Sequence, residues 1–558
     1  MKILGIKLTH DAAVAAIEDG RLKFCVEIEK IGNNPRYSKM WSNNYIHDIM
    51  VQENFNPKVF VVDGWKGALA TGTGHEDELI KVESYHEFDQ WAGPHGMRGF
   101  HAQGGLRIGA FDFPYHSFKH IYGHIFGAYV TAPWSAAREP CYSITWDGGM
   151  QPRIHHIDPA TGKVEFVDTV HELYSFIYGA MGRYFGPFKF EGIESIAIED
   201  LDDLQRAGGY EIPGKLMSYI ACGNVHEGLF YHLMSSYHSR FTIKSEHDHL
   251  HYDQSGENEH YMLRRAFTFA FKHDISDEDS LRTIHEFLEV MLVENATRKI
   301  PHGHNLIFVG GSALNIKWNS ALRRSGHFKA LWIPPFPNDS GSAIGQAAAY
   351  MALMKNHWTL DWSVYAGPRL QLGAVPEGWR QAACSVADLA HLLWTTDEPV
   401  LVMNGRAEVG PRALGNRSIM MSPASPYGKD KLNAIKNREA FRPVAPIALE
   451  EDAPEFFEPG TPDPYMLFDH RVKRLTNELM PAVVHLDGTA RLQTVNASQN
   501  AIVYELLNEF KKFSGYGVLC NTSANLNGAG FFPSIGDALE WGQVKYLWNG
   551  GTLYTKED

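Results

Sequence analysis

Cysteine is scarce in this chain, and long apolar runs are missing. The five cysteines lie far apart and form no CxxC pair, so the sequence favours neither a disulfide framework nor a cysteine-ligated zinc site. We expect them to be buried thiols. No apolar stretch reaches the ~20 residues that a membrane-spanning helix needs. The opening residues, MKILGIKLTHDAAVAA, form an alternating strand-like pattern instead of a signal peptide. These absences predict a cytoplasmic protein without a membrane partner.

Basic residues are outnumbered by acidic ones. The formal net charge of −14 argues against a broad nucleic-acid surface, because such surfaces gather lysine and arginine on one face. A local basic pocket is still compatible with this balance. We therefore expect no nucleic-acid partner and favour small anions as ligands.

The length and the order of the patterns predict an α/β protein. A chain of 558 residues exceeds what one hydrophobic core normally organises. Apolar strand-like runs end abruptly in glycines at 142–149 and 305–315, where open α/β sheets place their ligands. Helical patterns cover 280–297 and 342–354 and alternate with these strands.

A stretch of little periodicity divides the chain. Residues 357–378 contain tryptophans and prolines and no regular apolar spacing, so we place a linker there. The division gives an N-terminal domain over 1–356 and a C-terminal domain over 379–558, which is long enough to fold independently. No internal repeat or low-complexity tract is evident.

The first turns of the chain combine a hairpin signal with a polar loop. Asp19-Gly20 lies between two alternating runs, which predicts a β-hairpin. Thr9 to Asp11 form a short polar turn after the first strand, as at the phosphate-binding entrance of actin-like ATPase domains. His10 in this turn is a candidate general base, because imidazole titrates near neutrality; a structural histidine is the alternative.

Two short segments interleave cations with glycine and proline. Residues 404–418 read NGRAEVGPRALGNRS and residues 436–446 read KNREAFRPVAP, which together hold five arginines and a lysine. Guanidinium groups bind carboxylate or phosphate oxygens in pairs, and glycines let backbone N–H groups approach the same oxygens. The pattern indicates a site for a phosphorylated small molecule. A solvated loop with scattered charges is the alternative.

Two histidines have the spacing of metal ligands. His120 and His124 are four residues apart, which puts both imidazoles on one face of a helix. Asp147 and Asp339, each beside glycines, offer oxygen ligands, and such a His/His/Asp/Asp shell suits Fe, Mn or Zn. His116 continues the spacing, so periodicity alone does not decide which pair is used. An incidental pair in a histidine-rich chain is the alternative.

Two further loops offer polar groups to a nucleotide or phosphate. Gly310-Gly311 and Asn315 follow a strand and open a helix, where backbone N–H groups bind phosphate or ribose oxygens. Asn521 and Ser523 follow the strand YGVL, although local turn chemistry explains them equally well.

The order of these motifs resembles that of the NodU/CmcH O-carbamoyltransferase family, which includes enzymes of antibiotic biosynthesis. The resemblance covers almost the whole chain, and its most specific block is GPRALGNRS with the downstream FRPVAP. The matching motifs, in chain order, are HDAA, the His120/His124 pair, DGG, GGSALN, NDSGSAIGQA, GRAEVGPRALGNRS, KNREAFRP, DGTARLQTV and NTSAN.

The resemblance implies a Kae1-like N-terminal domain of the actin (ASKHA) type and a YrdC-like α/β C-terminal domain. It also implies two steps. Carbamoyl phosphate first loses its phosphate, and the carbamate attacks the α-phosphate of ATP, supplied with Mg, to give carbamoyladenylate and pyrophosphate. A hydroxyl of a small-molecule acceptor then attacks the carbamoyl carbon, and AMP leaves.

The same resemblance implies roles for individual residues. His10 corresponds to the proton acceptor. The family's ligands of an iron-type or other divalent metal correspond to His120, His124, Asp147 and Asp339. The carbamoyladenylate positions of the N-terminal domain are Arg36, Asp147, Gly310, Gly311 and Asn315. The carbamoyl phosphate and ATP positions of the C-terminal domain are Arg412, Lys436, Arg442, Arg491, Asn521 and Ser523.

Three departures from the family pattern stand out. Ile121 replaces the second histidine of the family's HHxxH. The family's basic ERFxRxKH segment is replaced by EKIGNNPRYSKM, where Arg36 is the nearest counterpart of an adenylate-contacting lysine and Lys39 is a rival. Gly528-Ala529-Gly530 replaces the usual Gly-Glu-Pro.

Other functions stay open at this stage. A threonylcarbamoyl-adenylate-type tRNA-modifying enzyme shares both domain types, but the acidic balance disfavours a tRNA partner. A non-catalytic nucleotide-binding regulator leaves Arg412, Arg442 and Arg491 unexplained. The histidine-rich stretch 226–261 borders the acceptor pocket or is a solvated insertion. A homodimer is the default for an enzyme of this size.

Overall fold

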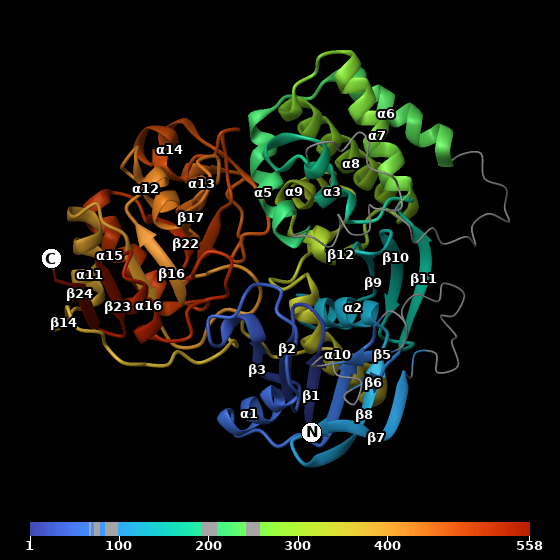
Figure 1. Ribbon diagram of the computed structural model, residues 1–558, viewed down its shortest axis with the longest axis horizontal. Helices are drawn as coiled ribbons and strands as arrows, with labels where there is room; N and C mark the ends of the chain where they lie inside the picture. Colours follow the sequence, from blue (N-terminus) through green and yellow to red (C-terminus); the bar gives the residue numbers. More distant parts are fainter. Residues whose placement is uncertain are drawn as a thin grey trace.

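Three larger β-sheets and the helices that cover them form the described part of the chain (Figure 1). The computed structural model describes residues 1–65, 69–71, 79–83, 97, 99–190, 209–241 and 257–557. Strands and helices alternate along most of this length, so the mixed α/β class predicted from the sequence is confirmed.

The first sheet is built from the opening hairpins of the chain. Its strand order is β3-β2-β1-β4-β8-β7, with β1 antiparallel to β2 and parallel to β4. The turn at Asp19 and Gly20 joins β2 to β3, so the predicted hairpin is confirmed. The strands are β1 Lys2–Lys7, β2 Ala13–Glu18, β3 Arg21–Glu27, β4 Val59–Asp63, β7 Phe100–Ile108 and β8 Phe111–Phe118, with α1 Asn44–Gln52 and the pair β5 Leu69–Thr71 and β6 Leu79–Lys81 at its margin.

The second sheet faces the first across two buried helices. Its order is β11-β10-β9-β12-β13, and α2 and α10 lie between the two sheets (Figure 1). Both helices are buried along most of their length, because α10 packs on the first sheet, α2 packs on the second sheet, and the two helices pack on each other. The elements are α2 His120–Thr131, α10 Ser342–Lys355, β9 Cys141–Thr145, β10 Arg153–Asp158, β11 Lys163–Thr169, β12 Asn305–Val309 and β13 Ala330–Trp332.

A layer of helices covers the outer face of the second sheet and shares a core with β9, β10 and β12. The longest, α8, begins after Ser276, whose side chain accepts a hydrogen bond from the Asp279 N–H, and carries acids in its first turn and bases in its last. The helices predicted over 280–297 and 342–354 are therefore confirmed as α8 and α10. The layer consists of α3 Ile177–Tyr184, α5 Ile212–Tyr219, α6 Glu227–Phe241, α7 Glu257–Lys272, α8 Asp277–Lys299 and α9 Ile316–Arg324.

Residues 356–378 run along both parts of the chain without regular secondary structure. At one end the Leu22 N–H donates to Asp361 O and the Cys25 N–H to Ala366 O. At the other end the Leu370 N–H donates to Gly405 O and the Gln371 N–H to Pro533 O. The segment thus connects the edge of the first sheet to the C-terminal loops.

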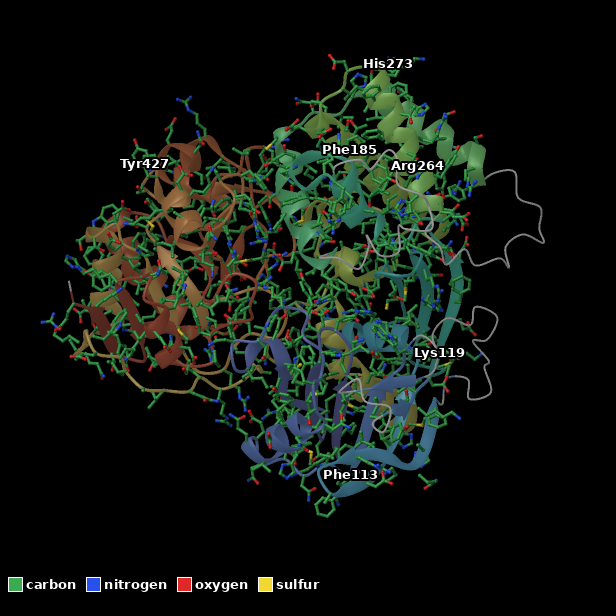
Figure 2. The ribbon with its side chains drawn as sticks, viewed as in Figure 1. Phe113, Lys119, Phe185, Arg264, His273 and Tyr427 are labelled. Atoms are coloured by element: carbon green, nitrogen blue, oxygen red, sulfur yellow. The ribbon has the colours of Figure 1, made fainter. Side chains whose placement is uncertain are left out.

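The C-terminal part, residues 379–557, contains the third sheet, in the order β14-β24-β23-β15-β16-β22-β17-β21. Its core is a separate apolar cluster packed by α11 and α15. Tyr427, 75% exposed, projects from the outer side of this part (Figure 2). The elements are β14 Trp379–Ala383, α11 Val386–Thr395, β15 Val400–Met403, β16 Arg417–Met421, α12 Gly428–Ile435, β17 Ala445–Leu449, α13 Ala453–Phe456, β18 Phe457–Glu458, β19 His470–Val472, α14 Arg474–Leu479, β20 Thr489–Ala490, β21 Gln493–Val495, α15 Ala501–Ser514, β22 Val518–Ser523, α16 Ile535–Trp541, β23 Tyr546–Asn549 and β24 Thr552–Lys556.

The cysteines depart from the expectation at one position. Cys25, Cys141, Cys384 and Cys520 are buried as expected, but Cys222 is exposed. It is the last residue of the 3₁₀ turn Ile220–Cys222, which directly follows α5. None of the described helices is long and apolar enough to cross a bilayer.

Candidate functional site

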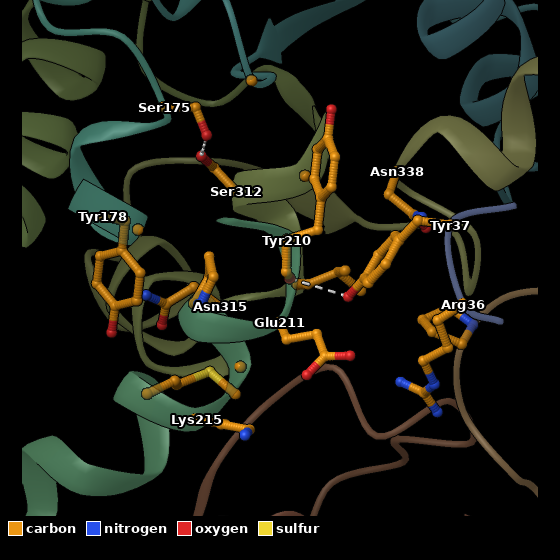
Figure 3. Close-up of a pocket in the computed structure, with 18 of the residues that line it drawn as sticks. Arg36, Tyr37, Ser175, Tyr178, Tyr210, Glu211, Lys215, Ser312, Asn315 and Asn338 are labelled. Carbon is orange, nitrogen blue, oxygen red and sulfur yellow. Dashed lines mark hydrogen bonds between the residues drawn. The ribbon is translucent and has the colours of Figure 1, made fainter. Parts of the chain in front are cut away.

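One cavity of about 690 Å³ lies where both parts of the chain meet. Arg36, Tyr37 and Asn338 line it from one side, Tyr178 and Asn315 from the other (Figure 3). The residues predicted from the sequence line it as well, except for His124 and Gly310, which adjoin the lining residues His120 and Gly311. Two groups of opposite charge, predicted from separate motifs, therefore share one space.

The acidic end of the cavity is a cluster of two histidines and two aspartates. The Nε2 atoms of His120 and His124 are 3.1 Å apart. Asp339 Oδ1 lies 3.2 Å and 3.3 Å from them, and Asp147 Oδ2 lies 3.7 Å and 3.8 Å from them. One atom from each of the four residues falls within 4.8 Å of the others, a geometry that would hold a metal ion.

The surrounding groups fix which nitrogen of each histidine faces the cluster. Asp63 Oδ2 lies 2.8 Å from Nδ1 of His120, and the carbonyl oxygen of Pro337 lies 3.1 Å from Nδ1 of His124. Both acceptors lie against the Nδ1 side of the rings, so the Nε2 atoms face one another at the cluster. Such carboxylate–histidine pairs are typical of metal sites.

The charge at this point favours a cation. Burial alone would lower the pKa of His120, but Asp63 and Asp339 outweigh burial and raise this pKa well above its usual range. The ammonium of Lys7 lies 3.1 Å from Asp63 and 3.0 Å from Asp339 and offsets only part of their charge. The donor set and the excess of carboxylates thus fit a divalent metal.

The alternative histidine, His116, does not belong to this cluster. It lies in β8, not in the helix of the other two, and its ring stacks on His101 at 4.3 Å. The four-residue spacing continues across the start of α2, so it no longer implies a common face.

His10 lies beside the metal cluster. Its Nδ1 is 2.9 Å from Asp11 Oδ2, and its Nε2 is 3.6 Å from Asp339 Oδ2. The carboxylate of Asp11 therefore holds the ring by one nitrogen and directs the other toward the cluster, an arrangement suited to a general base. The role predicted for His10 stays a prediction.

The glycine loop after β12 touches the same cluster. Gly310 has φ 92°, and a Cβ there would lie 2.4 Å from Trp146 O, so the turn needs glycine. The next N–H, of Gly311, donates to Asp147 Oδ1 at 2.7 Å. Asn315 caps α9 through its side-chain oxygen, while its Nδ2 is buried without a hydrogen-bond partner among the described residues. This loop positions Asp147 and leaves a donor at the cavity wall.

The other end of the cavity holds six cations, here called the cation group: Arg36, Arg412, Lys436, Arg438, Arg442 and Arg491. Burial, followed by repulsion from neighbouring cations, lowers the pKa of Arg412 to about 10 and that of Arg438 to about 9. Guanidinium groups stay protonated at neutral pH even so. The repulsion is relieved when an anion binds among them.

Members of the cation group differ in whether their donor groups already make hydrogen bonds. The Nε atoms of Arg412 and Arg491 are buried without hydrogen-bond partners among the described residues. Lys436, by contrast, donates to Ser523 O at 3.0 Å and to Asn525 Oδ1 at 2.7 Å, so it holds the loop after β22. Arg412 and Arg491 are the best placed to bind an incoming anion.

The loop after β22 also carries the two predicted polar residues. Asn521 Nδ2 donates to Ala413 O at 3.0 Å, and its Oδ1 is buried without a partner among the described residues. Ser523 Oγ donates to Asn525 Oδ1 at 2.6 Å and accepts from Arg438 Nη2 at 3.3 Å. Both side chains connect this loop to the arginine segments.

Two of the five arginines in the basic segments, Arg406 and Arg417, do not line the cavity. Arg417 is 1% exposed and donates to the backbone carbonyls of Asn404 and Asn416, and Arg406 pairs with Glu53. Both are turned away from the cavity because buried carbonyl or carboxylate groups need their donors. Arg438 of the second basic segment lines the cavity, although the family resemblance assigned no role to it.

Two of the departures from the family pattern contact one another. The Arg36 N–H donates to Gly528 O at 2.9 Å, and the Gly530 N–H donates to Asn34 O at 3.1 Å. A Cβ on Gly530 would lie 1.9 Å from Glu29 O. Arg36 lines the cavity, whereas the rival Lys39 lies over the ring of Trp41 and is not among the lining residues.

The histidine-rich stretch 226–261 is described only at its flanks, since 242–256 lie outside the described residues. Of its described residues, His260 of α7 lines the cavity. Tyr178, Tyr210 and Trp318 also line it, and no sequence pattern singled them out.

Family comparison agrees with the motif order. The carbamoyltransferase N-terminus model matches residues 2–348, and the carbamoyltransferase C-terminus model matches residues 391–556. The chain therefore belongs to the carbamoyltransferase family, as the resemblance indicated, and is an enzyme that transfers carbamoyl groups.

Full-length relatives are similar at moderate identity. Nodulation protein U of Rhizobium tropici is 41% identical over 574 residues, covering 100% of this chain and 96% of the relative. Nodulation protein U of Sinorhizobium fredii is 40% identical, covering 100% and 99%. The 3'-hydroxymethylcephem-O-carbamoyltransferase of Streptomyces clavuligerus is 30% identical, covering 100% and 99%. Among solved structures, component A of Acidaminococcus fermentans (R)-2-hydroxyglutaryl-CoA dehydratase is 12% identical, with a TM-score of 0.31. The match covers 64% of this chain and 99% of the solved chain, and this similarity is too low to establish a common fold.

Proposed function

We propose that this chain is an ATP-dependent O-carbamoyltransferase. It makes carbamoyladenylate from carbamoyl phosphate and ATP and then passes the carbamoyl group to a hydroxyl of a small-molecule natural product. One observation carries the proposal: a single cavity is lined by a cation group at one end and by a histidine–aspartate cluster with a candidate base at the other. The name of the Streptomyces clavuligerus relative supports a hydroxyl acceptor.

The first step is assigned to a YrdC-like domain, residues 379–558. Water releases phosphate from carbamoyl phosphate, and an oxygen of the resulting carbamate attacks the α-phosphorus of ATP, supplied with Mg. The bond from that phosphorus to the bridging oxygen breaks, and pyrophosphate leaves. Arg412, Arg442 and Arg491 offset the negative charge that builds on these oxygens.

The second step is assigned to a Kae1-like domain of the actin type, residues 1–356. A linker, residues 357–378, connects this domain to the YrdC-like domain. His10 takes the proton of the acceptor hydroxyl, whose oxygen attacks the carbamoyl carbon, and AMP leaves as the carbamate ester forms. Asp11 holds the ring of His10 for this role. An iron-type metal, when bound by the histidine–aspartate cluster, would supply positive charge beside the nucleotide phosphate.

Pyrophosphate release tests the proposal. Purified protein should release pyrophosphate from ATP only when carbamoyl phosphate is present, and a screen of hydroxylated metabolites should show products heavier by one carbamoyl group. No pyrophosphate with both substrates, under any acceptor condition, would contradict it. A filter-binding assay with tRNA separates it from a tRNA-modifying enzyme. A cytoplasmic location and a homodimer stay predictions.

A further inference from the structure

Arg36 and Tyr37 are adjacent in sequence and line the cavity from the same side, but their side chains contact different groups. Arg36 joins the cation group, where its charge contributes to lowering the pKa of Arg412. Tyr37 faces the other way, toward Tyr210, and the two rings lie side by side with centroids 5.2 Å apart (Figure 3). This dipeptide therefore marks the junction between the two centres.

A row of aromatic contacts leads from Tyr37 to the candidate base. The ring of Tyr210 lies 5.0 Å from that of His10, and His10 meets the edge of Trp65 at 5.3 Å. Trp65 in turn contacts His120 of the metal cluster at 5.5 Å. The ring of Tyr210 thus lies between those of Tyr37 and His10 and contacts both.

The backbone at Tyr37 is strained. Its φ is 62°, in the left-handed region that bulky residues rarely occupy. Contacts on both sides hold it there: its N–H donates to Glu29 Oε2 at 3.1 Å, and its hydroxyl donates to Tyr210 O at 3.0 Å. Burial raises the pKa of Tyr37 to about 12, so the hydroxyl keeps its proton. Strain held by specific contacts at such a place indicates a functional constraint.

Resting on the proposed function, we propose that Tyr37 is a positioning residue that keeps carbamoyladenylate in the cavity between its formation and its use. Its hydroxyl holds Tyr210 across the junction. When that contact is lost, the intermediate reaches solvent. There water attacks the carbamoyl carbon, AMP leaves, and the carbamic acid formed breaks down to CO2 and ammonia.

The experiment needs no acceptor. The full chain is mixed with ATP and carbamoyl phosphate, and pyrophosphate and AMP are followed over time. The wild type should release a burst of pyrophosphate close to one equivalent of active sites and then a slow phase. Tyr37→Phe keeps the ring and removes one hydrogen bond, so its slow phase should be faster by about 3- to 10-fold with the burst unchanged. Tyr37→Asn, which tolerates the left-handed backbone and removes the ring, should leak faster still.

Tyr427→Phe is the matched control, because this tyrosine is 75% exposed and is not among the residues that line the cavity. It should behave as the wild type. An unchanged slow phase in both Tyr37 variants would overturn the inference, as would a lost burst, which would assign Tyr37 to the first step or to folding. A wild-type protein that releases no pyrophosphate would instead contradict the proposed function.

Discussion

Asp63→Asn tests the metal centre without altering any of its four candidate ligands. Asp63 lies behind the cluster, where its carboxylate binds His120 Nδ1 at 2.8 Å, Gln346 Nε2 at 2.7 Å and the Lys7 ammonium at 3.1 Å. Asparagine has nearly the same shape but one accepting oxygen and no charge. The side-chain NH₂ of the new asparagine would then face a hydrogen-bond donor, either Gln346 Nε2 or His120 Nδ1, and that hydrogen bond is lost.

The size of the effect follows from this geometry. Losing a partner that orients a metal-bound histidine typically lowers metal affinity about 10- to 100-fold, which is about 1.4–2.7 kcal/mol. The substitution also removes one negative charge near the metal position. The lost hydrogen bond and the lost charge therefore both weaken metal binding. Asp339 still pairs with Lys7 at 3.0 Å, which limits the damage to folding.

The assay is a calorimetric titration of metal-stripped protein with Fe²⁺ or Mn²⁺ under anaerobic conditions. Asp48→Asn, with the same change of charge at a side chain that is 75% exposed, is the matched control and should bind as the wild type. An unaltered affinity in an Asp63→Asn variant whose thermal unfolding is normal would refute the reasoning. So would a wild type that binds neither metal.

Three further predictions follow from the same geometry. His10→Ala should spare pyrophosphate release and abolish carbamoyl transfer, since only the second step needs the base; equal loss of both would contradict this division of labour. Arg442→Ala should slow pyrophosphate release about 10²- to 10³-fold, as expected for a lost cation at developing charge, whereas Arg369→Ala, 66% exposed, should not. Burial, opposed by Lys30, raises the pKa of Glu27 from 4.5 to about 7. The folded state therefore binds this proton more tightly than the unfolded chain, and the resulting stability is lost as pH rises from about 4.5 through 7. Urea unfolding across this range should show the fall, and Glu27→Gln should flatten it; an identical profile in the variant would assign the fall to other groups.

Local signals were enough for much of the fold. The hairpin at Asp19-Gly20 and the ends of α8 depend on residues only a few positions away, namely turn glycines, capping side chains and first-turn acids. The motif order likewise predicted the family. It assigned the two charged groups to separate pockets in different domains, whereas the structure places both groups in one cavity.

Long-range contacts decided which of these charges face the cavity. Arg412 and Arg417 stand in the same sequence block, yet Arg412 lines the cavity and Arg417 binds backbone carbonyls. No spacing rule separates them, because the choice depends on which acceptors the fold brings near each guanidinium.

The partners behind the metal cluster show the same limit. Lys7 and Asp63 read as ordinary residues at the ends of β1 and β4, and only the parallel pairing of these strands places both beside His120 and Asp339. The sequence determined which chemical groups are available and the local structures that carry them. Tertiary structure decided their burial and neighbours, and therefore their charge and direction, because electrostatic interactions act between groups close in space, however far apart they lie along the chain.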